Sequence, residues 1–254
     1  MDLRGWPSKM APMCALVLLF RFLEDSPVFV AANRDEAYDR PSSPPGLLVG
    51  DAHRSLAPRD RRSGGTWIGF NDAGVFAAIT NRPGDFDPLR PSRGELVPLA
   101  LDQATAEDAS KAIAARVAEG RENPFRLVVA DASTAWLVSD DAKPAQLAPG
   151  AHLLTNEHGL NAFTVPALEQ IRAAQTIAEA EAAAREVLAD HAAHEGAHRF
   201  CKHGQGRGTV SSSLVWIPNE GVDAAEFLYA AGPPCRVPYQ RYSNLVKRLK
   251  TGEE

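Results

Sequence analysis

The sequence has few cysteines. Its 254 residues include three, Cys14, Cys201 and Cys235, and three thiols cannot all pair within one chain. Small secreted domains held together by disulfides carry cysteine at a far higher density. We therefore exclude a disulfide-stapled domain and expect the protein in a reducing compartment.

Long apolar runs are also missing. The run Ala15–Phe20 follows Arg4 and Lys9, as the core of a signal peptide would, but it is short, is broken by Arg21 and has no small-residue cleavage site behind it. No other stretch reaches the roughly 18 apolar residues needed to cross a bilayer. We predict a cytoplasmic protein without a membrane span.

Basic charge is not in excess either. The net charge is −5, and acidic and basic residues are interspersed. Nucleic-acid binding requires a basic patch or stripe, so we predict a small-molecule partner and no nucleic acid. The chain is long enough for a substantial core, and it has neither an internal repeat nor a linker that would divide domains. Residues 14–250 are expected to form one domain.

Strand hairpins and helix pairs alternate along the chain. Apolar runs at residues 14–22 and 28–32 flank a turn, and "GTWIGF" and "VFAAIT" flank "NDAG", in which Gly74 can take a positive φ. "FRLVVAD" and "TAWLVSD" predict a third hairpin, with "HLLTN" as the next strand. The final strands are "TVSSSLVWIP" and "AEFLYAA", and a polar tail follows them.

Helical spacing is found in two blocks, residues 95–118 and residues 166–193. Thr105 and Asp108 form a capping pair for the second helix of the first block. The proline-rich "RPSSPPG" at residues 40–46 is expected to be a loop. Hairpins indicate antiparallel sheets, and paired helices pack on sheet faces. The predicted fold class is α+β, with two antiparallel sheets between helical layers.

Cys14 is the first candidate for chemistry, because it follows Met13 and precedes an apolar strand. If translation began at Met13, removal of that methionine would leave Cys14 with a free α-amine. Such an amine has a pKa of about 7.7–8.0 and can serve as a general base for the thiol. A buried cysteine that acts as a small core hydrophobe is the alternative.

Residues 1–13 would prevent this self-activation. Asp2 blocks removal of Met1, so a chain that starts there keeps Cys14 within a peptide bond. The segment has no apolar periodicity and contains Gly5 and two prolines. We expect it to be a leader that is cut before Cys14 or a wrongly assigned start, and to be disordered or absent in the mature protein.

The stretch "ANRDE" places four polar residues at the end of an apolar strand, and the hairpin would return them beside Cys14. Strand alternation directs Asn33 and Asp35 to one side and Arg34 and Glu36 to the other. A carboxylate there can hold an α-ammonium group, and an arginine can stabilise a thiolate or an oxyanion. A solvated turn with a salt bridge is the alternative.

Two asparagines end strands in a similar way. Asn81, followed by Arg82, comes after "AAIT", and Asn156 comes after "HLLT". An asparagine amide is a suitable donor to an oxyanion, although asparagine is also common in turns at strand ends.

Five stretches occur in the order of a known family: Met-Cys before a strand, "ANRDE", "GGTWIGFNDAGVFAAITN", "SRGELV" and "LLTNEHGL". Together they resemble the NRDE family, also called the transport and Golgi organisation 2 family. The resemblance extends from Cys14 to about Trp216. It implies a four-layer αββα sandwich of the N-terminal nucleophile hydrolase type, with a cysteine similar to that of choloylglycine hydrolases and penicillin V acylases.

The resemblance also implies residue roles. Cys14 would be the nucleophile, Arg34 and Asp35 would flank it, and Asn81 and Asn156 would form the oxyanion site. Asn33, Glu36, Arg82 and Arg207 would be supporting residues. In "GRGTVSSSL", Val210 stands where the family commonly has an arginine, which puts the role of that late arginine in doubt.

The histidine-rich stretch "HAAHEGAHRFCKH" lies outside this pattern. His194 and His198 have an i, i+4 spacing that suits a metal if the stretch is helical. The glutamate of a HExxH motif is missing, and no second ligand pair is evident in the sequence. We predict a solvated helix end between His191 and His203, with no metal.

Two functions remain open. One is an N-terminal cysteine hydrolase that cleaves a linear amide or related acyl bond (a carbon–nitrogen bond other than a peptide bond) through a thioester, with no cofactor. The other is a non-catalytic carrier or chaperone for haem or another hydrophobic ligand, because the family is also linked to haem trafficking. Acylation of Cys14 favours the first, and haem binding without acylation favours the second.

Overall fold

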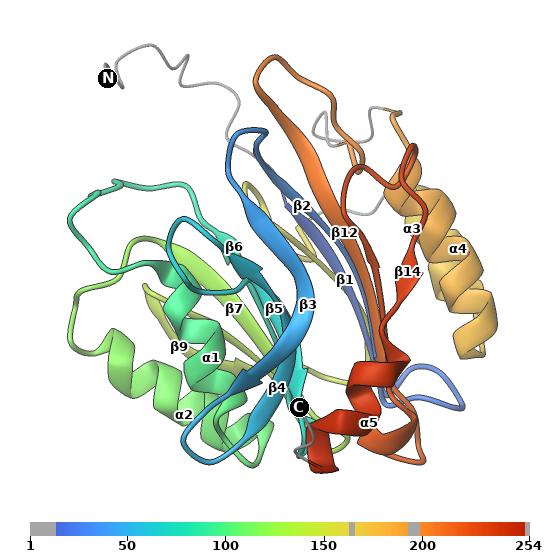
Figure 1. Ribbon diagram of the computed structural model, residues 1–254, viewed down its shortest axis with the longest axis horizontal. Helices are drawn as coiled ribbons and strands as arrows, with labels where there is room; N and C mark the ends of the chain where they lie inside the picture. The colour runs from blue at the N-terminus through green and yellow to red at the C-terminus, as the bar shows by residue number, and fades with distance from the viewer. Residues whose placement is uncertain (1–13, 163–165, 193–198, 252–254) are drawn as a thin grey trace.

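A computed structural model describes residues 14–162, 166–192 and 199–251. The chain forms two antiparallel sheets stacked face to face, with a helical layer outside each (Figure 1). This is the predicted α+β, four-layer αββα arrangement. The proposed leader, residues 1–13, lies outside the described residues.

The first sheet contains the N-terminal hairpin at its centre. Its strands, in spatial order, are β11 (Gly159–Leu160), β10 (Gly150–Thr155), β1 (Ala15–Phe20), β2 (Val28–Ala37), β12 (Arg207–Ile217), β13 (Glu226–Ala230) and β14 (Gln240–Arg241). The second sheet follows chain order: β3 (Ser42–Val49), β4 (Arg54–Asp60), β5 (Ile68–Asn71), β6 (Phe76–Asn81), β7 (Phe125–Ala130), β8 (Ala135–Ser139) and β9 (Ala142–Gln146).

The helices form two outer layers. A short 3-10 turn (Arg93–Glu95) leads into α1 (Leu96–Leu101), which packs with α2 (Ala106–Val117) against the second sheet. The first sheet is covered by α3 (Pro166–Ala173) and α4 (Ile177–Ala189). Within the described residues, no helix combines the length and apolarity that a bilayer crossing requires.

Three apolar clusters fill the spaces between the layers. In β1, Leu16, Leu18 and Phe20 face the second sheet, whereas Val17 and Leu19 face α3 and α4. Because both faces are covered, β1 is a continuous apolar run without polar alternation. The same apolar character that resembled a signal peptide therefore belongs to a central strand.

The predicted hairpins are confirmed. β1 pairs with β2, β5 with β6 and β7 with β8, all antiparallel, and Gly74 has a φ of 84°. The side chain of Thr105 accepts a hydrogen bond from the backbone N–H of Asp108 at 3.0 Å, which caps α2 as expected.

Two predictions were wrong. Residues 40–46 are not a loop, because β3 begins at Ser42. Strand β3 is at the edge of its sheet and its pairing with β4 is irregular between Ser43 and Gly46; edge strands and bulges are where a sheet accepts proline. The polar tail contains β14 and the helix α5 (Ser243–Thr251), in which Val246 and Leu249 are buried in the core between the sheets.

Candidate active site around Cys14

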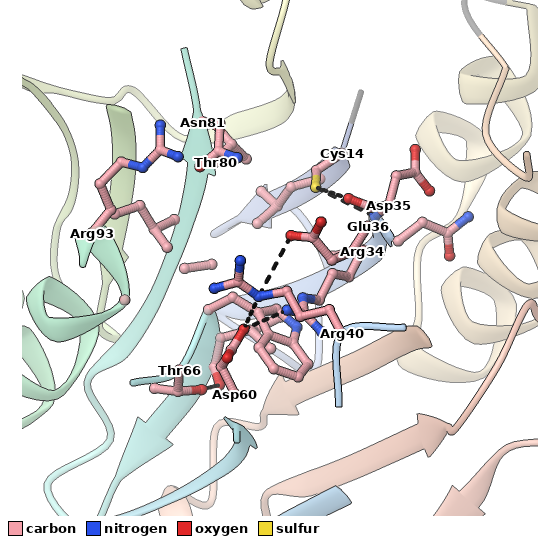
Figure 2. Close-up of a pocket in the computed structure, with 18 of the residues that line it drawn as sticks. Cys14, Arg34, Asp35, Glu36, Arg40, Asp60, Thr66, Thr80, Asn81 and Arg93 are labelled. Carbon is pink, nitrogen blue, oxygen red and sulfur yellow. Dashed lines mark hydrogen bonds and ion pairs between the residues drawn. The ribbon is translucent and has the colours of Figure 1, made fainter. Parts of the chain in front are cut away.

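Cys14 directly precedes the first residue of β1, at the end of the sheet where β1 lies between β2 and β10 (Figure 2). The next residue, Ala15, pairs with Asn33 of β2 on one side and with Thr155 of β10 on the other. The backbone carbonyl of Cys14 accepts a hydrogen bond from the N–H of Asn156 at 3.4 Å. The hairpin therefore returns the Asn33–Glu36 motif to Cys14, as the sequence predicts. The motif does not end the strand, because β2 continues through it to Ala37.

The thiol of Cys14 is held against the backbone of Asp35. The N–H of Asp35 donates to Sγ at 3.5 Å, and the thiol approaches the carbonyl oxygen of the same residue at 3.9 Å. Burial, with a further contribution from the negative charge of Asp35, raises the pKa of Cys14 to about 11, although the Asp35 N–H, Lys202 and Arg34 oppose that rise. At neutral pH the thiol is protonated and needs a base to become a nucleophile.

Asp35 points to the side of the sheet that α4 covers. Its carboxylate is paired with the Lys202 ammonium at 2.6 Å and accepts a hydrogen bond from the Thr209 hydroxyl at 2.7 Å. Burial raises the pKa of Asp35, while Lys202 and Thr209 favour the ionised form. The carboxylate is therefore fixed in place by two partners from the β12 side of the sheet.

Asn33 points the same way and tethers the helical layer. Its amide nitrogen donates to the carbonyl oxygens of Leu188 and Phe200, both at 2.8 Å. These bonds tie the end of α4 and the segment that follows it to β2. Asn33 also lines the cavity described below, but its amide donors are committed to this anchoring.

Arg34 and Glu36 face the space between the sheets, as alternation predicts. The Arg34 guanidinium donates to Asp60 of β4 at 2.7 Å and lies 4.0 Å from the centroid of the Trp67 ring. Asp60 also binds Arg40 at 2.6 Å. Burial opposes ionisation of Asp60, but the hydrogen bonds from Arg40 and from the backbone N–H of Ser63 hold the pKa of Asp60 below its usual range.

A cavity of about 130 Å³ opens beside Cys14 (Figure 2). Three carboxylates and three arginines line it: Asp35, Glu36, Asp60, Arg34, Arg40 and Arg93. Lys202 and Arg207 contact two of those carboxylates, at 2.6 and 3.5 Å. Five cations therefore surround three anions, and the positive excess suits a thiolate, an oxyanion or an anionic ligand.

The two predicted oxyanion asparagines occupy different positions. Asn81 ends β6 and lines the cavity across from Cys14 (Figure 2). Asn156 is buried next to the backbone of Cys14, and its carbonyl accepts a hydrogen bond from Arg126 at 2.9 Å. Among the described residues that line the cavity, Asn81 is present and Asn156 is not. Their roles as oxyanion donors remain predictions.

Arg82 is bound to a different part of the second sheet. Its guanidinium donates to both carboxylate oxygens of Asp140, at 3.1 and 2.7 Å, and approaches Asp141 at 3.1 Å. Asp140 also accepts from the N–H of Phe125. Arg82 therefore anchors the turn between β8 and β9 to the end of β6.

Arg207 lies close to the position at which the family commonly has an arginine. Val210 lies where the pairing of β12 with β2 is irregular, between Thr209 and Ser211. Arg207, three residues earlier, forms an ion pair with Glu36 at 3.5 Å. Burial lowers the pKa of Arg207, and the negative charges of Glu36 and Cys14 oppose that effect. A cation thus reaches the site although Val210 supplies none.

Four residues of this site were missed in the sequence: Arg40, Asp60, Arg93 and Lys202. Arg93 belongs to "SRGELV", one of the stretches that carry the family resemblance, so a signal existed for it. Asp60 and Lys202 come from strand and loop positions with no local pattern, and only the stacking of the sheets brings them to β2.

Comparisons with known proteins identify the family whose sequence this chain matches. The sequence model of the family described as Transport and Golgi organisation 2 matches residues 13–200. The human Transport and Golgi organization protein 2 homolog is 34% identical over 142 residues, and the mouse homolog is 32% identical over 142 residues. Each match covers 51% of this chain and 50% of the relative, so the matched region spans about half the length of those relatives.

A solved structure shows the fold. Penicillin V acylase from Agrobacterium tumefaciens superposes with a TM-score of 0.50 at 16% identity, and the match covers 86% of this chain and 83% of that one. At this identity the likeness concerns the fold, which is that of the N-terminal nucleophile hydrolases, and it leaves the chemistry to be argued from the site.

Proposed function

We propose that this chain, which belongs to the Transport and Golgi organisation 2 family, is an N-terminal cysteine hydrolase that cleaves a linear amide or a related acyl bond through a thioester. The bond cleaved would be a carbon–nitrogen bond other than a peptide bond in a protein. The substrate is a small molecule, and the reaction uses no cofactor. Function in the reducing environment of the cytoplasm is part of this proposal.

The observation that carries the proposal is the placement of the Cys14 thiol. It lies at the start of a central strand, accepts a hydrogen bond from the Asp35 N–H and borders a cavity lined by three carboxylates and three arginines. Lys202 and Arg207 contact two of those carboxylates from outside the lining, which brings the cations to five. A cysteine that served only as a small core hydrophobe would not need such surroundings. The fold shared with penicillin V acylase is consistent with this use of the thiol.

The proposed reaction has two steps. In the first, the free α-amine of mature Cys14 takes the thiol proton, sulfur bonds to the substrate carbonyl carbon, and the amine leaving group departs with that proton, which leaves a thioester. In the second, the α-amine removes a proton from water, the hydroxide attacks the thioester, and the acid product and the Cys14 thiol are released.

Side chains around the cavity would stabilise the negative charge that develops on the carbonyl oxygen. The proposed amide donors are Asn81, which lines the cavity, and Asn156, which lies outside that lining but next to the backbone of Cys14. One such donor is worth roughly 3–4 kcal/mol in the transition state. The Nη1 atom of Arg34 is buried and has no hydrogen-bond partner within the described part of the chain. Arg34 lines the cavity, so this donor can serve the thiolate or an anionic group of the substrate.

Maturation is part of the mechanism. While Cys14 is joined to Met13, its nitrogen is an amide without basicity, and the thiol pKa stays at about 11. We propose that residues 1–13 are removed, or are never translated, in the active protein. Intact mass spectrometry of protein from its native cells should then show a chain that begins at Cys14.

The decisive experiment compares two forms of the chain, one beginning at Cys14 and one retaining residues 1–13, in their reaction with an acylating probe. Labelling of Cys14 in the mature form should rise through an apparent pKa near that of an α-amine, about 7.7–8.0. In the longer form it should be slow at neutral pH and rise about tenfold per pH unit towards pH 11, because only the thiolate reacts. Equal labelling of both forms at neutral pH would contradict the self-activated thiol.

An exposed apolar loop supports the second candidate function. Phe86 and Leu89 are exposed, and Phe86 lies 5.6 Å from the guanidinium of Arg93, which lines the cavity. Such a loop suits the acyl chain of a substrate, and it equally suits haem or another hydrophobic ligand held by a carrier. A titration with haem followed by its absorption spectrum separates the two. Haem binding together with failure of every acylating probe at Cys14 would favour the carrier.

A further inference from the structure

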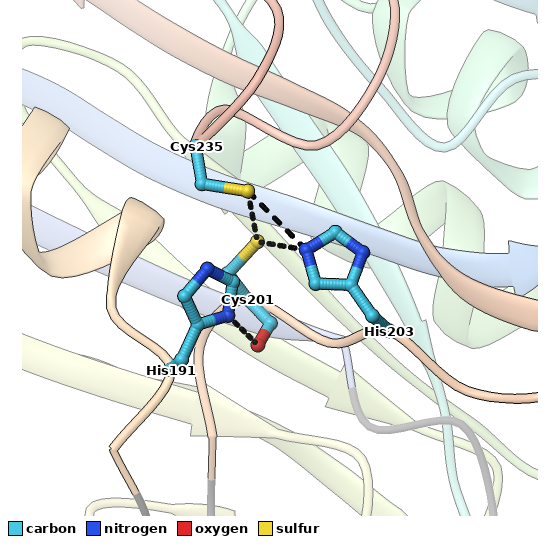
Figure 3. Close-up of side chains that lie close together, drawn as sticks. All are labelled: His191, Cys201, His203 and Cys235. Carbon is cyan, nitrogen blue, oxygen red and sulfur yellow. Dashed lines mark hydrogen bonds between the residues drawn. The ribbon is translucent and has the colours of Figure 1, made fainter.

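A second group of sulfur and nitrogen atoms lies apart from the Cys14 cavity. His191 follows α4, Cys201 and His203 precede β12, and Cys235 lies between β13 and β14 (Figure 3). Each of the four side chains offers one atom that can bind a metal, and these atoms all lie within 4.8 Å of one another. Residues far apart in the sequence thus converge on one point.

The separations are close to those of a tetrahedral metal centre. The sulfurs of Cys201 and Cys235 are 3.6 Å apart. Nε2 of His203 lies 3.2 Å from the sulfur of Cys235 and 3.9 Å from that of Cys201. Around Zn²⁺, with Zn–S of about 2.3 Å and Zn–N of about 2.0–2.1 Å, a regular tetrahedron has edges of about 3.8 Å between sulfurs and about 3.5 Å between sulfur and nitrogen. Three of the four ligand atoms need little rearrangement.

The fourth ligand is already oriented. Nδ1 of His191 lies 3.1 Å from the carbonyl oxygen of Cys201, and donation to this carbonyl leaves Nε2 available for a metal. Metal-binding histidines commonly donate their other ring nitrogen to a carbonyl or carboxylate, which fixes the ring and its tautomer. His191 is exposed, so its ring has room to adjust when a metal binds.

We propose that His191, Cys201, His203 and Cys235 form a closed Zn²⁺ site with two thiolate and two imidazole ligands. Both thiols release their protons as the metal binds, and the two negative charges then balance the charge of the ion. A Cys₂His₂ set with no open position is typical of a structural zinc site and not of a catalytic one. The sulfur separation of 3.6 Å is well beyond the roughly 2.05 Å of a disulfide.

The site would fix a segment that reaches the Cys14 region. Cys201 is followed by Lys202, whose ammonium binds Asp35. The backbone of Lys202 is held by Thr209, through hydrogen bonds of 2.9 Å in both directions, and the N–H of Cys201 donates to Asp190. A metal at this point would join the end of α4, the start of β12 and the connection after β13.

The sequence predicts no metal here. His194 and His198, the pair with helical spacing, lie outside the described residues. Cys235 is 34 residues beyond Cys201, and no local motif connects them. The proposed ligand set therefore depends on the fold and not on sequence spacing.

The test begins with protein purified without a histidine tag, in reducing buffer containing Zn²⁺ and then freed of excess metal. Elemental analysis should find about one zinc per chain. Replacement by Co²⁺ should produce the visible bands of a tetrahedral ion and the near-ultraviolet charge-transfer band of thiolate ligands. Cys235→Ser and His203→Ala should lower the zinc content at least about tenfold. Cys14→Ser, which removes the third thiol, should leave it unchanged.

A second measurement covers the case in which the variants fail to fold. In the wild-type protein, alkylation mapped by mass spectrometry should spare Cys201 and Cys235 until a chelator is added, after which both should react. A zinc content below about a tenth of an equivalent per chain would overturn the proposal. So would alkylation of Cys201 and Cys235 that a chelator does not change, or a disulfide between them in protein purified in reducing buffer.

Discussion

The chain uses its three thiols in two contrasting settings. Cys14 has no other thiol beside it, and it is held against the Asp35 backbone at a cavity whose three carboxylates are surrounded by five cations, Lys202 and Arg207 included. Cys201 and Cys235 lie 3.6 Å apart next to two imidazoles. The first setting can stabilise a thiolate that attacks a substrate once a base has removed its proton. The second can stabilise two thiolates only when a cation lies between them.

The difference shows that the role of a cysteine follows from its neighbours. Burial raises the pKa of Cys14 to about 11 and, with Cys235 as a further contribution, that of Cys201 to about 12, so neither thiol is reactive by itself at neutral pH. An α-amine would activate the first and a metal ion the second. Lys202 links the two regions, because it follows Cys201 in the chain and its ammonium forms an ion pair with Asp35 at 2.6 Å.

The largest expected effects come from replacing one cysteine of each setting by serine, in two separate variants. Cys14→Ser should abolish acylation by a reactive probe, because a hydroxyl is far less acidic than a thiol, while its zinc content stays at the wild-type level. Cys235→Ser should do the reverse, with zinc lost and acylation of Cys14 retained. Mass spectrometry of labelled protein and elemental analysis measure both. A Cys14→Ser variant that still turns over a substrate would refute the nucleophile assignment.

Next in size is the loss of the cation that links the two regions. Lys202→Met leaves the buried Asp35 carboxylate without its counter-ion, and we expect a loss of roughly 2–4 kcal/mol in the free energy of unfolding at pH 7. Without Lys202 the pKa of Asp35 rises further, so the loss should shrink as the pH falls towards the unfolded value of about 3.9 and Asp35 takes up a proton. Chemical denaturation at several pH values measures this.

The double variant Lys202→Met with Asp35→Asn is the control, because it removes both charges and should recover most of the stability. Lys111→Met, at an exposed ion pair on α2, should cost little. A Lys202→Met variant with unchanged stability at pH 7 would show that Asp35 does not depend on this ion pair.

A somewhat smaller effect is expected on the other face of β2. Asp60→Asn leaves the buried Arg34 without a carboxylate, and we expect a loss of roughly 2–3 kcal/mol at pH 7. The folded-state pKa of Asp60 is lowered, so its contribution is present above about pH 3.9 and is lost as the pH falls through the folded value. The difference between variant and wild type should therefore fade only in strong acid. A difference that is already gone at pH 5 would contradict the pairing.

The smallest effect should come from Arg207→Met. The ion pair with Glu36 is partly exposed and 3.5 Å long, so its loss should cost less than about 1 kcal/mol of stability. Acylation of Cys14 should slow by a few-fold at most, because Arg34, Arg93 and Lys202 remain. If Arg207→Met slowed acylation as much as Cys14→Ser, Arg207 would have the role that the family gives to its late arginine.

The sequence determined much of the fold because its signals were local. The hairpin turns, the Thr105 cap and the apolar strands were all recognisable within a few residues of one another. The errors came where context overrides local preference. The prolines of residues 40–46 were accepted because β3 is an edge strand, and α5 forms because Val246 and Leu249 have a core to pack against.

By itself the sequence determined that Cys14 precedes a buried strand and that the Asn33–Glu36 motif returns beside it, since a hairpin and strand alternation suffice for both. Only the tertiary structure decided which charges surround that thiol. Asp60 contacts Arg34 because the two sheets stack face to face. Lys202 contacts Asp35 because the pairing of β12 with β2 brings the segment before β12 close to Asp35. The meeting of Cys201 with Cys235 has the same origin, because side-chain contacts between distant segments depend on how the layers pack and not on any local pattern.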